Sequence, residues 1–95
     1  MNPISTGPEV GLVIKTVREV QGWYGFLMVG QDEVFFHQRQ GRDIISGRDG
    51  PEWRRPYHHI SPPSEGTRIV FIREKGTSKA IAWGLEDEYI AAKVA

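Results

Sequence analysis

The distribution of apolar and polar positions along the chain indicates short β-strands separated by turns. The strand candidates are rich in β-branched and aromatic residues, and Gly or Pro marks their ends, as at Gly22, Gly30 and Pro62-Pro63. Five segments fit this description: 10–20, 23–29, 33–37, 65–76 and 79–85. We therefore expect an all-β fold whose first three strands form a meander.

The remaining chain divides into one long connection and one tail. Residues 38–64 are rich in Gly and Pro, and we expect a long loop of 27 residues between the third and fourth strands. Residues 86–95 begin with acidic residues and have a helical spacing of apolar ones, with disorder as the alternative. Five strands in a 3 + 2 grouping predict a small antiparallel barrel, closed or nearly so, because closure removes exposed strand edges. An SH3-like barrel is the alternative architecture.

Strand alternation divides the aromatic residues between two faces. In 23–29, Tyr24, Phe26 and Met28 share one face, whereas Trp23, Gly25, Leu27 and Val29 share the other. In 33–37, Phe35 and His37 lie opposite to Val34 and Phe36. A tight turn at 30–32 aligns the two strands, and the resulting set, here called the ring surface, consists of Tyr24, Phe26, Phe35 and His37.

The ring surface is expected to face outward. Interiors pack at crystal-like density, so a chain of 95 residues has no room inside for both sets of rings. We assign Leu27, Val29, Val34 and Phe36 to the core. Exposed rings suit the π-faces of unstacked bases. The alternatives are that the loop 38–64 covers the rings or that they form a self-association surface.

Composition limits the function classes. Ninety-five residues make one domain, 1–95, with its core at about 10–85. The chain has no Cys, which excludes disulfides and thiolate metal sites. A metal set could combine its His residues with an Asp, but the spacing disfavours one; the residues concerned are His37, His58, His59, Asp43 and Asp49. No nucleophile elbow or phosphate loop is present, so we expect neither an enzyme nor a cofactor.

Neither the net charge nor the first residues of the sequence indicate a particular partner or secretion. Twelve basic residues balance twelve acidic ones, but residues 39–60 carry five Arg and a net charge of +2, and residues 86–95 carry −2. The first residues show no secretory signal, and no apolar run is long enough for a membrane span. We therefore expect a cytoplasmic protein that does not bind membranes.

Three segments resemble the cold-shock domain, an OB-fold family that binds single-stranded nucleic acid. The segment 22–27 (GWYGFL) is similar to the family's first ribonucleoprotein motif, K-G-F-G-F-I, with matches at Tyr24, Gly25, Phe26 and Leu27. The segment 34–38 (VFFHQ) is similar to the second, V-F-V-H-F, with matches at Val34, Phe35 and His37. The segment 65–76 resembles the family's fourth strand, E-G-x-x-V-x-F-x-x-E-x-G, with matches at Glu65, Gly66, Phe71, Glu74 and Gly76.

The resemblance implies an OB-fold-like barrel that binds single-stranded RNA or DNA. The implied contacts combine the rings with basic residues: Lys15, Trp23, Tyr24, Phe26, Phe35, His37, Arg39, Arg54 and Arg55. Two family features are missing, because the first strand lacks both aromatic residues of G-x-V-K-W-F and Gln38 replaces an aromatic residue. Each lost platform is worth about 1–3 kcal/mol, so we expect weaker or altered binding unless the Arg residues of 38–64 compensate.

A protein-interaction module is the second functional hypothesis. In this case Tyr24, Phe26, Phe35 and Trp83, or the tail residues Tyr89 and Ile90, would pack against a partner or a second copy of the chain.

Overall fold

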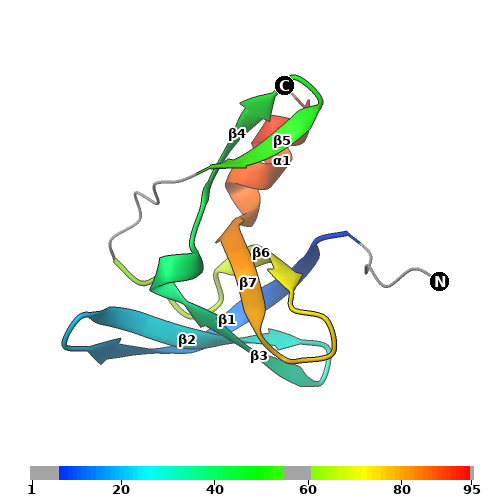
Figure 1. Cartoon of the computed structure of the whole chain (residues 1–95). Helices are drawn as coiled ribbons and strands as arrows, with labels where there is room; N and C mark the ends of the chain where they lie inside the picture. The colour runs from blue at the N-terminus through cyan, green and yellow to red at the C-terminus, as the bar shows by residue number, and fades with distance from the viewer. Residues whose placement is uncertain (1–6, 55–60, 95) are drawn as a thin grey trace.

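The fold is mostly β and is described by a computed structural model for residues 7–54 and 61–94 (Figure 1). The chain order begins with β1 (Glu9–Glu19), β2 (Gly22–Val29), β3 (Asp32–His37) and a short 3-10 helix, η1 (Gln38–Gln40). It continues with β4 (Asp43–Gly47), β5 (Gly50–Arg54), β6 (Arg68–Arg73), β7 (Ala80–Leu85) and the helix α1 (Glu86–Val94).

Five of the strands form one curled antiparallel sheet in the order β3-β2-β1-β6-β7. These are the five strands predicted from the sequence, with bounds close to those expected. The sheet curls until its two edge strands meet at one point, where the Phe35 N–H donates to the Ser78 carbonyl at 2.9 Å and Phe35 forms a parallel bridge with Lys79. The result is a small, barrel-like sheet.

The expected long loop 38–64 is only partly a loop. It contains η1 and a β4–β5 hairpin that forms a separate two-stranded sheet. The hairpin packs against α1 at one end of the molecule, away from β2 and β3 (Figure 1). Burial explains the difference, because Ile44 and Trp53 of the hairpin join Tyr89 and Ala92 of α1 in a second apolar cluster. Alternation in 43–54 is too brief to reveal strands whose partner is a distant helix.

The tail forms the helix α1 over Glu86–Val94, as its acidic start indicates. Glu88 Oε1 accepts a hydrogen bond from the Ile44 N–H at 3.1 Å, and the Glu86 carboxylate pairs with Arg68 at 2.6 Å. This pairing raises the pKa of Arg68, mainly through the hydrogen bond to Glu86. The acidic first turn therefore ties the helix to the strands beneath it. Within the described residues, no helix has both the length and the apolar character needed to cross a membrane.

The main core lies on the concave side of the five-stranded sheet. Its buried members include all the residues predicted for the core except Val29, which is partly buried against it; they are Val13, Trp23, Leu27, Val34, Phe36, Ile69, Phe71, Ala80 and Trp83. Trp23, Phe36 and Trp83 stack edge-on or tilted, with centroids 5.1–5.6 Å apart. This aromatic centre occupies the interior and leaves no space there for the ring surface.

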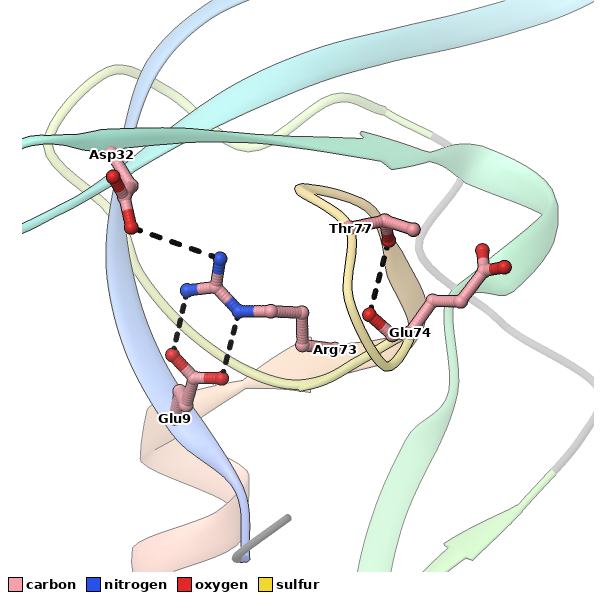
Figure 2. A network of polar contacts seen from close by, with 5 residues as sticks. All are labelled: Glu9, Asp32, Arg73, Glu74 and Thr77. Atoms are coloured by element: carbon pink, nitrogen blue, oxygen red, sulfur yellow. Dashed lines mark hydrogen bonds and ion pairs between the residues drawn. The ribbon is translucent and has the colours of Figure 1, made fainter. Parts of the chain in front are cut away.

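A polar network at the C-terminal end of β6 connects this strand to the starts of β1 and β3 (Figure 2). Arg73 makes a two-point contact with Glu9 at the start of β1, at 2.8 and 3.0 Å, and its third nitrogen lies 3.9 Å from Asp32 at the start of β3. The Glu9 hydrogen bond is the main cause that raises the pKa of Arg73 above its ordinary value. Beside it, the Thr77 hydroxyl donates to the Glu74 carbonyl at 3.0 Å and closes the β6–β7 turn.

Candidate nucleic-acid interface

The four residues of the ring surface lie together on the outer face of β2 and β3. Each is partly exposed, whereas their immediate neighbours Trp23, Leu27, Val34 and Phe36 are buried. Phe35 is the centre of the group, with its ring centroid 5.5 Å from Tyr24, 5.9 Å from Phe26 and 6.3 Å from His37. Of the loop region 38–64, residues 38–54 form η1 and the hairpin on α1 and leave these rings partly exposed.

Strand register arranges these side chains in two rows across the sheet. In the first row, Lys15 of β1 pairs with Phe26, Phe26 pairs with Phe35, and Phe35 bridges to Lys79 beside β7. The second row places Val17 opposite Tyr24 and Tyr24 opposite His37. Cross-strand partners share a face of the sheet. The first row therefore runs from one lysine over two phenyl rings to a second lysine.

A β-bulge brings Lys15 into this row. Val13 is buried and pairs with Leu27, and simple alternation would place Lys15 on the same inner face. The register shifts between Val13 and Lys15, so that Lys15 instead pairs with Phe26. Its ammonium lies over the Phe26 ring, 5.4 Å from the centroid. Because of the bulge, the Lys15 side chain lies on the outer face of the sheet instead of the inner face.

His37 is held in place by contacts on several sides. Its Nδ1 accepts a hydrogen bond from the Arg39 backbone N–H at 3.0 Å, and its carbonyl accepts one from the Trp83 indole at 2.7 Å. Since Nδ1 is an acceptor here, the ring proton is assigned to Nε2, which lies 4.0 Å from the Glu19 carboxylate. These contacts fix both the edge of the ring surface and the start of η1.

The cations of the described residues divide into paired and unpaired ones, and three of the unpaired ones concern the ring surface. Arg54, Arg68 and Arg73 each have a carboxylate partner at 2.6–2.8 Å. In contrast, Lys15, Arg39 and Lys79 form no ion pair with any part of the chain that the structure describes. All three lie at the ring surface or next to it. A chain of zero net charge therefore still offers unpaired positive charge beside its exposed rings.

A hollow of about 230 Å³ opens where β3, η1 and the start of β7 meet. We call it the seam hollow, and its lining residues are Phe35, His37, Arg39, Gln40, Lys79 and Ala80. Two of these belong to the ring surface and two are unpaired cations. Lys79 was not among the predicted site residues, because only the curling of the sheet brings the β6–β7 turn beside Phe35.

Several of the expected site residues lie elsewhere. Trp23 was expected at the interface but is 1% exposed, since alternation places it on the inner face. Trp83, part of the proposed protein-interaction surface, is fully buried as well. Arg54 lies in the hairpin on α1, where Glu52 holds its guanidinium, so it does not join the rings.

Other expectations fall outside the described residues, namely those for Arg55, His58 and His59. Searches of protein-family models, curated proteins and solved structures found no match for this chain.

Proposed function

We propose that this chain is an OB-fold-type module, similar to cold-shock domains, that binds single-stranded RNA or DNA on the outer face of β2 and β3. The observation that carries the proposal is the row Lys15, Phe26, Phe35 and Lys79, with Tyr24 and His37 beside it. Bases would stack on the rings, and the lysines would neutralise phosphates at both ends of the row.

The topology supports the same interpretation. An OB-fold is a five-stranded, partly open barrel that binds oligonucleotides on the face of its second and third strands and on neighbouring loops. Here the ring surface lies on β2 and β3, and Lys79 belongs to the turn between the fourth and fifth strands of the curled sheet. Neighbouring strands lie about 4.8 Å apart, so the row from Lys15 to Lys79 extends over about 14 Å.

The interface has fewer stacking platforms than the resemblance implies. Val17 occupies the β1 position beside Tyr24 and offers apolar contact without a planar π-system. Binding then depends on the rings of β2 and β3, and on unpaired cations that salt can screen.

The test is a direct binding experiment with a labelled oligothymidylate of about seven nucleotides, in which fluorescence anisotropy at low salt measures the bound fraction. A label on the ligand is preferable to intrinsic fluorescence, because Trp23 and Trp83 lie behind the sheet. We expect saturable binding that weakens with added salt. Tyr24→Ala should weaken it, whereas Ile90→Ala, a change at an exposed apolar residue of α1, should not. Absence of binding at tens of micromolar protein would contradict the proposal.

A further inference from the structure

The seam hollow is large enough to admit a nucleobase. Its volume of about 230 Å³ is many times what a single water molecule needs. Phe35 and His37 form part of its lining and belong to the ring surface. A base could therefore enter the hollow from a strand that is stacked on the rings.

The polar lining of the hollow consists mainly of hydrogen-bond donors. Arg39 and Lys79 can only donate, and neither is occupied by a carboxylate of the described residues. Gln40 adds an amide that donates and accepts. The His37 Nδ1 is already bonded to the Arg39 N–H, so it is not an acceptor for a ligand in this arrangement. The side chains thus favour a partner that presents acceptors.

Guanine fits this pattern best among the four common bases. It presents two adjacent acceptors, O6 and N7, on one edge, and Arg and Lys are the usual partners of that edge. On the same edge adenine places an amino donor beside N7. Cytosine (O2 and N3) and thymine (O2 and O4) also present acceptors, but on other edges that are not the usual partners of Arg and Lys. Two unpaired cations beside a ring therefore favour the O6–N7 edge of guanine.

We propose that the seam hollow is a guanine subsite, in which Arg39 and Lys79 donate to O6 and N7 while the base lies against Phe35 or His37. This inference rests on the proposed function and adds a base preference to it. The residues that determine specificity then come from η1 and from the turn before β7, two segments that are 40 positions apart in the sequence.

The experiment replaces one thymidine at a time by guanosine in the oligothymidylate used above. At one position guanosine should raise the affinity by about fivefold to 150-fold, the range expected for a two-point contact to a base edge. Inosine keeps O6 and N7 and should retain the gain, whereas 7-deazaguanosine lacks N7 and should lose most of it. Adenosine and cytidine at the same position should give no gain.

Substitutions test whether the preference for guanosine depends on the residues that line the seam hollow. Arg39→Gln and Lys79→Gln should each reduce the guanosine gain at least severalfold. Arg48→Gln in the β4–β5 turn and Lys75→Gln in the β6–β7 turn remove the same charges from residues that do not line the hollow, and should leave the gain intact.

Two results would overturn the inference without touching the proposed function. One is tight oligothymidylate binding with no position that prefers guanosine. The other is an equal loss of affinity for every oligonucleotide in Arg39→Gln and Lys79→Gln, which would make the hollow a phosphate site. If no oligonucleotide binds at all, the proposed function fails and the inference fails with it.

Discussion

Phe35 and Phe36 are adjacent in β3 but face opposite sides of the sheet, and this permits a sharp test of the ring surface. Phe36 is fully buried and contacts Trp23 and Trp83 with ring centroids 5.6 and 5.1 Å away. Phe35 is partly exposed, and its ring contacts are with the outer rings Tyr24, Phe26 and His37. The same substitution, Phe to Ala, should therefore affect stability at one position and binding at the other.

For Phe36→Ala we expect a loss of about 3–5 kcal/mol in the free energy of unfolding, as for other fully buried Phe residues. A domain of this size has about 5–15 kcal/mol in total, so the variant approaches the limit of folding. Phe35→Ala removes the ring contacts with Tyr24 and Phe26, worth about 1–3 kcal/mol together. It should lower affinity for the oligothymidylate by about 1–3 kcal/mol, which is about fivefold to 150-fold.

Urea denaturation measures the free energy of unfolding, and anisotropy titration measures the affinity for the oligothymidylate. Phe35→Leu serves as a control, because it keeps most of the apolar contact and removes the planar ring. It should retain stability and still bind weakly. If Phe35→Ala destabilised the fold as strongly as Phe36→Ala, or bound as tightly as the unmodified chain, the assignment of faces to function would be wrong.

Three further changes test the surrounding structure. Arg73→Met should cost about 1–3 kcal/mol of unfolding free energy by breaking the contact with Glu9. Glu9 raises the pKa of Arg73, so the stabilisation by this contact is present below the ordinary Arg pKa and is lost only as the pH rises above it. Urea denaturation should therefore give the same loss of unfolding free energy for Arg73→Met at about pH 6 and at about pH 9. A loss that differs between the two pH values would contradict this assignment. Gly25→Ala should destabilise by about 1–3 kcal/mol in the same assay, because its Cβ would lie 2.7 Å from a carbonyl oxygen of β1; an unchanged midpoint would contradict the close packing of β1 on β2. Lys15→Gln should reduce the slope of log affinity against log salt by about 0.7, and an unaltered slope would remove Lys15 from the phosphate contacts.

The distribution of charge explains how a neutral chain could still attract a polyanion. Several Arg residues are neutralised locally, as Arg68 is by Glu86 and Arg54 by Glu52. Lys15, Arg39 and Lys79, at the ring surface or next to it, are among the cations that have no such partner within the described residues. Net charge averages over both groups, whereas a ligand at the ring surface experiences mainly the second.

The local sequence was sufficient for the strands of the main sheet and for the two faces of β2 and β3. Alternation depends only on the covalent geometry of an extended chain, so the separation of Phe35 from Phe36 could be read from the order of residues. Trp23 obeys the same alternation, and its assignment to the interface followed from its place in a motif. The helical start of the tail was visible because acidic residues favour a helix N-terminus.

Only the tertiary structure decided which distant segments meet. The β4–β5 hairpin depends on burial of Ile44 and Trp53 against α1, which is remote in the sequence. The outward position of Lys15 depends on a bulge, and the seam hollow depends on the curl that brings Lys79 beside Phe35. These features arise from packing and hydrogen bonding between segments far apart in the chain. Such contacts are set by the energy of the whole fold, and no local pattern of residues specifies them.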